Sequence, residues 1–332
     1  MKNNHPKINY GKTGILLVNL GTPDSTSWLD IRKYLKEFLS DRRVIEVNPI
    51  IWQIILNLFI LNFRPSKTAK AYKEIWMKEE DMSPLRYYTI KQTEKLSQKI
   101  GSESLKVDYA MRYGSPGIES VIKKLKEQGC ENLIVLPLYP QYAAATTATV
   151  CDEVYRSLMK MRWQPSLQII PHYESNNLYI KALSDSLKKK INEISWKPDL
   201  ILASYHGIPK KYFDKGDPYQ CYCQKTSRLL IETFGEEIPI QTSFQSRFGP
   251  QEWLQPYTDK TFEKLPAEGK KNILVICPGF ASDCVETLEE IAIQGKETFI
   301  KSGGENFDLV PCLNDNDNHI NLFQKLVERC FY

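Results

Sequence analysis

Hydrophobic residues along this chain gather into short uninterrupted runs, and stretches of helical period separate these runs. Runs that are apolar at consecutive positions are typical of parallel strands covered on both faces, whereas half-buried strands alternate. The runs occupy 15–20, 132–137, 200–206 and 272–278. Between them, apolar residues recur every three or four positions, for example over 118–125 and 180–191. Strands and helices in this alternation predict an α/β fold with parallel sheets.

The same succession of features occurs twice, which indicates two copies of one structural unit. In each half a strand ends in Gly-x-Pro, an Arg-aromatic-Gly motif comes later, and a threonine follows a further strand. The matched segments are 21–23 with 207–209, 111–114 with 246–249, and 146–147 with 286–287.

We therefore expect two similar doubly wound, Rossmann-like lobes with parallel sheets and a cleft between them. The N-terminal lobe is predicted over 10–170 and the C-terminal lobe over 171–317. A last helix over 318–332 is predicted to pack back on the N-terminal lobe. Because ligands in open α/β sheets bind beyond the carboxyl ends of the strands, the residues after the repeated strands are the first candidates for a site.

Composition narrows the classes of function. The 332 residues include 44 Lys and Arg against 40 Asp and Glu, a net charge of +4 that is spread along the chain. This balance argues against nucleic acid as a partner. Neither a G-x-G-x-x-G motif nor a Walker-type loop occurs, which disfavours a nucleotide cofactor and an NAD-type enzyme.

The start of the chain and its cysteines bear on the compartment. The apolar run 15–20 is short and ends in a turn, so we predict a cytoplasmic protein without a signal peptide. The eight cysteines are dispersed, and free thiols are expected in place of disulfides. Cys221 and Cys223 come nearest to a thiolate metal motif, but two cysteines make no closed site.

The segment 49–63 is strongly apolar. Gln53, Asn57 and Asn62 interrupt it, and it is shorter than the about 20 residues of a membrane-spanning helix. Two interpretations stay open. The pattern favours a buried amphipathic helix, and the alternative is an apolar lip on a pocket that rests on a bilayer.

Of the four histidines, His206 alone closes a predicted parallel strand. A neutral imidazole accepts a proton or binds a transition metal near neutral pH. The plain alternative is a hydrogen-bonded histidine at a strand end. Its position at the predicted cleft favours a functional role.

Three acidic residues follow the last repeated strand of the second half. Asp283, Glu286 and Glu290 are spaced so that a helix beginning near 283 would carry them on one face. Acids in a first turn also stabilise the helix dipole, which accounts for Asp283 and Glu286 but not for Glu290. A row of carboxylates leading from a cleft could carry protons away or pass on a divalent cation.

Taken together, these features resemble the ferrochelatases over nearly the whole chain, from Gly14 to His319. The matching segments are 14–23, 83–85, 139–142, 204–209, 216–219, 245–250 and 282–288. Each is weak alone, but their order and spacing are specific. The likeness to members from Gram-negative bacteria implies a lyase that inserts Fe²⁺ into protoporphyrin IX to form protohaem, the terminal step of haem biosynthesis.

The resemblance also implies roles for single residues. His206 would be the proton acceptor and a metal ligand, with Glu286 as its partner in both roles, and Asp283 and Glu290 would extend an acidic path. The segment 49–63 would be the apolar lip, in peripheral contact with the inner membrane. The porphyrin pocket would be lined by Leu20, Arg112, Tyr113, Tyr139, Trp253 and Phe280.

Departures from the family pattern limit what is carried over. Cys284 stands where animal members have histidine, and Ala144 stands where cluster-bearing animal enzymes have a cysteine. We therefore expect no [2Fe–2S] cluster of that type and no required cofactor, with Fe²⁺ as a substrate. Some bacterial members use internal cysteines, which leaves Cys221 and Cys223 open. The alternatives are a coproporphyrin III ferrochelatase and a non-catalytic tetrapyrrole or metal carrier, which would need no base.

Overall fold

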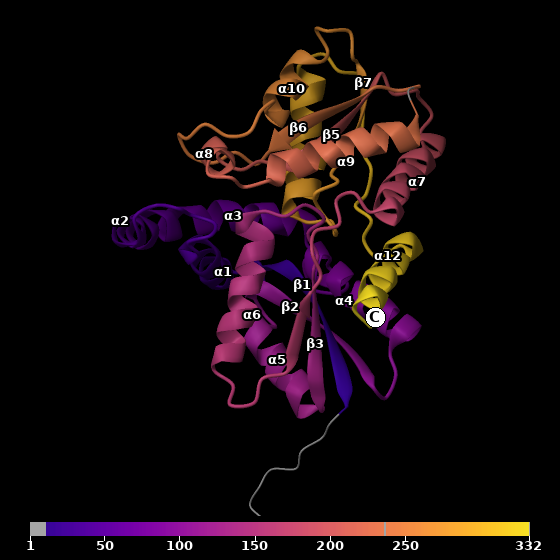
Figure 1. Ribbon diagram of the computed structural model, residues 1–332. Helices are drawn as coiled ribbons and strands as arrows, with labels where there is room; N and C mark the ends of the chain where they lie inside the picture. Colours follow the sequence, from indigo (N-terminus) through magenta and orange to yellow (C-terminus); the bar gives the residue numbers. More distant parts are fainter. Residues whose placement is uncertain (1–10, 236, 332) are drawn as a thin grey trace, which may run out of the picture.

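The computed structural model describes residues 11–235 and 237–331, and these form two four-stranded parallel sheets, one above the other in Figure 1. The strand orders are β2-β1-β3-β4 and β6-β5-β7-β8, so the second half repeats the topology of the first. This confirms the predicted fold class. The strands are β1 Lys12–Thr22, β2 Leu105–Gly114, β3 Cys130–Pro137, β4 Ser166–Ile169, β5 Leu200–His206, β6 Ile240–Gln245, β7 Asn272–Ile276 and β8 Asn306–Leu309.

Helices flank both sheets, and three segments are π-helices, here labelled η1 to η3. In the first half they are α1 Trp28–Ser40, α2 Pro49–Ile55, η1 Leu56–Ile60, α3 Leu61–Ile75, α4 Pro84–Ile100, α5 Ile118–Glu127, η2 Ala144–Ala148, α6 Thr149–Met159 and α7 Asn177–Glu193. In the second half they are α8 Lys210–Asp214, α9 Tyr219–Phe234, α10 Thr258–Lys264, η3 Glu286–Gly295, α11 Lys296–Lys301, α12 Asp317–Glu328 and the 3₁₀ turn η4 Arg329–Phe331.

Burial on both faces explains the continuous apolar runs. In β1, Ile15 and Leu17 face one hydrophobic cluster, whereas Leu16 and Val18 face another on the opposite side of the sheet. All four side chains are fully buried. Each contributes about 1.5–3 kcal/mol to stability by leaving water, so a polar residue at any of these positions would be costly.

The two halves exchange their last helices. α7 follows β4 but packs against α9 of the second half, whereas α12 follows β8 but packs against α4 of the first (Figure 1). Both helices begin at an asparagine N-cap, Asn176 and Asn316. One hydrophobic cluster contains residues of both sheets and of both exchanged helices. The halves therefore share a core on this side of the molecule.

Strand register shows which residues of the halves are equivalent. Leu16 pairs with Val135 in β3, and Leu202 pairs with Val275 in β7, so Leu16 and Leu202 take the same place. It follows that Gly21 corresponds to Gly207, and that Leu20 takes the place of His206. The first pair of matched segments is thereby confirmed, whereas the third pair, 146–147 with 286–287, lies beyond the paired strands and stays a prediction.

The second matched pair of segments, 111–114 with 246–249, is wrong by two residues. Each edge strand receives a backbone contact from a later segment, Met111 N to Pro116 O at 2.7 Å and Phe244 N to Pro256 O at 2.8 Å. Met111 is thus equivalent to Phe244, and Arg112 to Gln245. Arg247 lies in a loop beyond the end of β6, whereas Arg112 lies within β2, so the two arginines are not equivalent.

The segment 49–63 forms α2, η1 and the start of α3, beside the second half in Figure 1. The favoured interpretation of a buried amphipathic helix is wrong for most of the segment: Leu56 and Leu61 are fully buried, but no side chain of α2 is buried. Ile50 is 74% exposed and Phe63 is 75% exposed. Within the described part of the chain, no helix combines the length and the apolar character needed to cross a membrane.

Candidate active site

His206 stands at the carboxyl end of β5, half-buried, with two aromatic side chains near its ring. The ring centroids of Trp253 and Phe280 each lie 6.5 Å from that of His206. Its Nδ1 is 2.6 Å from the carbonyl oxygen of Gly207. Because a carbonyl only accepts, Nδ1 carries the proton, and Nε2 is left as the basic nitrogen.

Gly207 allows Trp253 to lie against this strand end. A Cβ on Gly207 would come within 3.0 Å of the Gln245 carbonyl oxygen and 3.2 Å of Trp253 Cε3. Trp253 is held in turn by its Nε1, which donates to the carbonyl oxygen of Phe248 at 2.9 Å. The Gly-x-Pro signature thus serves to seat an aromatic side chain beside His206.

Glu286 and Glu290 lie on η3, the π-helix that follows β7. Wide π turns occur often at functional sites, and in such a turn residues four apart share a face. Glu290 accepts from Ser246 N at 2.7 Å and from Ser246 Oγ at 2.5 Å. Burial raises the pKa of Glu290, and the Glu286 charge adds to this, while Ser246 and His206 oppose it. His206 and the two carboxylates thus form one electrostatic group.

Asp283 lies in the loop before η3, so the expectation of one α-helical face carrying all three acids is wrong. The carboxylate is buried. Its Oδ2 accepts from Asn314 Nδ2 at 2.6 Å, and its Oδ1 accepts from Thr287 Oγ1 at 3.1 Å and from Cys312 N at 3.3 Å. Asp283 is therefore held by neighbours of its own half.

Leu20 and Phe280 bring the two halves together at the site. Both pack against one small cluster, which contains Leu85, Met111 and Cys284. Leu20 belongs to the end of β1, and Phe280 to the loop after β7. The strand end that is equivalent to that of His206 therefore contributes an apolar side chain to this cluster.

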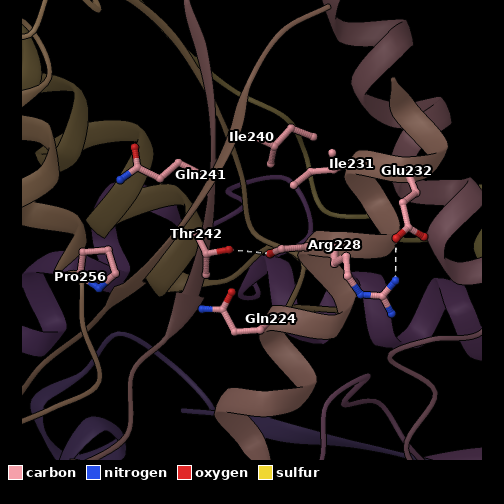
Figure 2. Close-up of a pocket in the computed structure, with 9 residues that line it drawn as sticks. Gln224, Arg228, Ile231, Glu232, Ile240, Gln241, Thr242 and Pro256 are labelled. Carbon is pink, nitrogen blue, oxygen red and sulfur yellow. Dashed lines mark hydrogen bonds and ion pairs between the residues drawn. The ribbon is translucent and has the colours of Figure 1, made fainter. Parts of the chain in front are cut away.

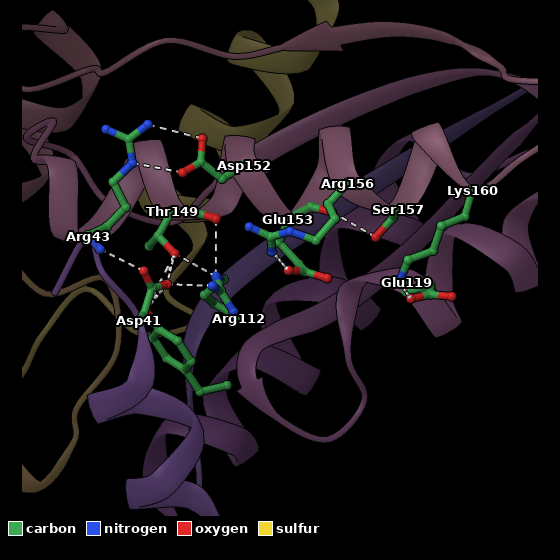
Figure 3. Close-up of polar contacts among 11 residues, drawn as sticks. Asp41, Arg43, Arg112, Glu119, Thr149, Asp152, Glu153, Arg156, Ser157 and Lys160 are labelled. Carbon is green, nitrogen blue, oxygen red and sulfur yellow. Dashed lines mark hydrogen bonds and ion pairs between the residues drawn. The ribbon is translucent and has the colours of Figure 1, made fainter. Parts of the chain in front are cut away.

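Arg112 and Tyr113 are joined through Asp41, and Figure 3 shows Asp41 beside Arg112 and Thr149. Asp41 Oδ2 accepts from Arg112 Nη2 at 2.5 Å, from Tyr113 Oη at 2.9 Å, and from the Thr149 hydroxyl. Burial alone would raise the pKa of Asp41, but the hydrogen bonds from Thr149 and Arg43 and the Arg112 charge outweigh it and lower the pKa. Tyr113 is fully buried and Arg112 is 9% exposed.

Tyr139 lies near this group, in the cluster behind β1 and β3. Its hydroxyl is buried and has no hydrogen-bond partner among the described residues. Burial raises its pKa strongly, and Tyr113 adds to the shift. The hydroxyl is thus available as a neutral hydrogen-bond donor.

Sequence reasoning missed three residues of the first half that face Glu286. Burial raises the pKa of Tyr72, and Glu286 adds to that shift. The same two causes act on Tyr34. Burial lowers the pKa of Arg64, and Glu286 opposes this; its guanidinium lies 4.4 Å from the Phe248 ring centroid. No motif marks them, because they reach the site only through tertiary packing.

The described structure contains a cavity beside Arg112 and another away from the predicted site residues. One, of about 1020 Å³, has a polar lining from α1, the loop 41–49, α6 and Lys215, and Arg112 is the predicted site residue on its wall. The other, of about 650 Å³, lies between α9 and β6 (Figure 2). Its lining includes none of the predicted site residues.

Cys221 and Cys223 both lie on α9. Cys221 is exposed on α9, whereas Cys223 is buried and its thiol pKa is raised by burial, so the two thiols meet different surroundings. Among the described residues, no group of three or more His, Cys, Asp or Glu side chains is placed to hold a metal ion.

Known structures define the class to which this fold belongs. SirB from Bacillus subtilis, solved with Fe³⁺, matches with a TM-score of 0.59 at 14% identity, over 96% of this chain and 95% of that one. A second structure of SirB, described as a sirohydrochlorin chelatase in complex with cobalt, matches with a TM-score of 0.57. The fold is therefore that of the two-lobed chelatases.

Sequence comparison is more specific. The family model described as Ferrochelatase matches residues 12–330. The ferrochelatase of Rhizobium etli is 54% identical over 98% of this chain and 95% of its own length. That of Francisella tularensis is 52% identical over 96% of each. The chain belongs to the ferrochelatase family, and the predicted enzyme class, a metal-inserting lyase of haem biosynthesis, is confirmed.

Proposed function

We propose that this protein inserts Fe²⁺ into protoporphyrin IX to form protohaem, with His206 as the base that accepts the pyrrole protons. The observation that supports this most is the 2.6 Å contact of His206 Nδ1 with Gly207 O, which assigns the proton to Nδ1 and leaves Nε2 basic. Family membership supplies iron as the substrate metal. The choice of protoporphyrin IX as the porphyrin substrate is the more specific part of the proposal.

Metallation breaks two pyrrole N–H bonds and forms bonds from the ring nitrogens to Fe²⁺, so two protons must leave. His206 takes a proton, and Glu286 is its partner in accepting protons and in holding the incoming Fe²⁺. Glu290 leads the proton onward, because burial raises its pKa above the ordinary range of a carboxyl group and so favours its taking up a proton. Asp283 is the fixed inner end of this acidic path.

The macrocycle would lie between the halves, with Trp253 and Phe280 beside His206 and Leu20 opposite. Tyr139 offers an unpaired hydroxyl to a polar group of the substrate. Arg112 and Tyr113 close the far wall, where Asp41 fixes both. Apolar walls of this kind exclude water and favour a bent macrocycle closer to the transition state.

We also propose a cytoplasmic protein that touches the inner membrane through 49–63. Ile50, Phe59 and Phe63 expose large apolar surfaces on one segment, which is typical of an interfacial anchor. Flotation with anionic vesicles should recover the wild type, and Ile50→Ser with Phe63→Ser should remain in the bottom fraction. Equal flotation of both proteins would contradict this contact.

No resident cofactor is part of the proposal, and we propose that no [2Fe–2S] cluster is bound at Cys221 and Cys223. Burial of Cys223, which raises the pKa of its thiol, supports this because a cluster ligand must be a thiolate. Protein as isolated should lack cluster absorption in the visible range. Cluster absorption together with about two irons per chain would overturn it.

The test combines anaerobic Fe²⁺, a porphyrin and purified protein, and follows loss of porphyrin fluorescence with gain of haem absorbance. His206→Ala should lose about 10²–10⁴-fold in turnover, the range for a general base. His172→Ala is the matched control, since that surface histidine pairs with Glu174 at 2.5 Å. Faster turnover of coproporphyrin III would change the substrate, and binding without turnover by every protein would favour a carrier.

A further inference from the structure

A buried glutamine on α4 connects the first half to the loop that begins η3. Gln92 is fully buried, although it lies on a helix of the opposite half. Its Nε2 is 3.2 Å from Ala281 O, 3.0 Å from Ser282 Oγ and 2.9 Å from Asn314 O. Two of these acceptors are carbonyl oxygens, so only the amide nitrogen suits this place. One turn later, Lys95 Nζ reaches Asp315 at 2.7 Å.

The acceptors of Gln92 lead directly to the carboxylates of η3. Asn314 clamps Asp283, accepting from its backbone N at 2.8 Å and donating to its Oδ2 at 2.6 Å. Asp283 in turn accepts from Thr287, the neighbour of Glu286 on η3. A short chain of hydrogen bonds thus runs from the first half to the first turn of η3.

The other half contains an equivalent contact without a catalytic helix. Thr226 on α9 is fully buried, donates to Glu174 O at 3.0 Å, and accepts from Gln141 Nε2 at 3.0 Å. Glu174 is the counterpart of Asn314, because each stands two residues before the asparagine that caps an exchanged helix. The loop held there leads into η2, which carries no carboxylate.

We propose that Gln92 is a positioning residue for metal insertion: from the first half it holds the start of η3 and so sets where Glu286 and Glu290 stand relative to His206. This inference rests on the function proposed above for these carboxylates. The π-helix is a rare form, and η3 keeps it over 10 residues, so its surroundings must stabilise it. A displacement of about 1 Å at a catalytic group can lower a rate about a hundredfold.

The test compares Gln92→Met, which keeps the length of the side chain but has no N–H donor, with Thr226→Val at the equivalent contact. Both variants should unfold at a lower temperature than the wild type, since each loses a buried hydrogen bond between the halves. Only Gln92→Met should lower kcat, by about ten- to a hundredfold. The KM for protoporphyrin should stay within about twofold of the wild type, since the porphyrin walls are untouched.

Asn314→Gly provides a second variant should Gln92→Met fail to fold. Asn314 has a φ of +45°, a left-handed conformation that glycine adopts freely. This variant removes the clamp on Asp283 and should show the same loss of kcat at unchanged KM. Wild-type kcat in a folded Gln92→Met or Asn314→Gly, or equal kcat losses in Gln92→Met and Thr226→Val, would overturn the inference.

His206→Ala in the same assay separates the two claims. If it is inactive while Gln92→Met keeps the wild-type kcat, the proposed function stands and the positioning role falls. If His206→Ala keeps wild-type turnover, the proposed site is wrong and the positioning role falls with it.

Discussion

The carboxyl ends of β1 and β5 occupy equivalent places in two copies of one fold, yet they carry different chemistry. Leu20, near the end of β1, takes the place of His206 at the end of β5, and the π-helix after β3 carries no carboxylate, whereas the one after β7 begins with Glu286. In the proposed function, the first half thus provides an apolar wall where the second half provides proton-accepting groups. A repeated fold needs only one chemically active copy, and the other is free to bind the substrate.

Glycines at the two strand ends show the largest structural contrast. Gly21 has a φ of +111°, and a Cβ there would lie 1.8 Å from the Tyr113 carbonyl oxygen. Gly21→Ala should therefore cost about 3–5 kcal/mol of the free energy of unfolding, measured by denaturant titration. Gly207→Ala, without a positive φ, should cost about 1 kcal/mol and mainly displace Trp253. Similar losses in both would contradict the contrast.

Arg112 and its counterpart Gln245 give the second contrast. Arg112→Gln places in the first half the residue that the second half has at the equivalent position. It leaves Asp41 buried without its ion pair, which should lower the free energy of unfolding by about 3 kcal/mol. Because the pKa of Asp41 is lowered in the folded state, the wild type gains this stability above the ordinary pKa of 3.8 and loses it as pH falls. Melting temperatures of the two proteins should converge in acid.

Arg247→Gln is the control for that prediction. Its partner is Asp259, at 2.7 Å, and both side chains are more than 40% exposed. An exposed pair contributes about 0–1 kcal/mol, so this variant should melt near the wild type at every pH. A large fall in melting temperature for Arg247→Gln, with little change for Arg112→Gln, would favour the pairing of Arg112 with Arg247 that the strand register corrects.

Glu290 gives the smallest expected effect, which is a change in how the melting temperature depends on pH. Its pKa is raised by burial in the folded state, so folding favours the protonated form, and wild-type stability falls as pH rises above the ordinary value of 4.5. Glu290→Gln should remove this fall in melting temperature. Glu289→Gln is the control and should keep this fall in melting temperature, because Glu289 accepts from Gln294 in an exposed contact. An unchanged slope in Glu290→Gln would contradict the burial of that charge.

The parts of the site that follow from sequence are those encoded by consecutive residues. His206 and Gly207 could be placed at a strand end because an apolar run leads directly to them. The contact of Gln92 with the loop before η3 could not, since Gln92 meets Ser282 across 190 positions of the chain. Segment 49–63 was predicted from its pattern as buried, but what covers a face depends on tertiary packing. The π-helix also lacks a distinct residue pattern.

The central claim, that the chemistry resides in the second half, is tested most directly by exchanging its base for the residue of the first. His206→Leu should bind protoporphyrin as the wild type does, by fluorescence titration, but form haem from Fe²⁺ about 10²–10⁴-fold more slowly. Leu20→Ala, measured beside it, should raise the KM for the porphyrin with a far smaller loss of kcat. Near-wild-type haem formation by His206→Leu would contradict the account.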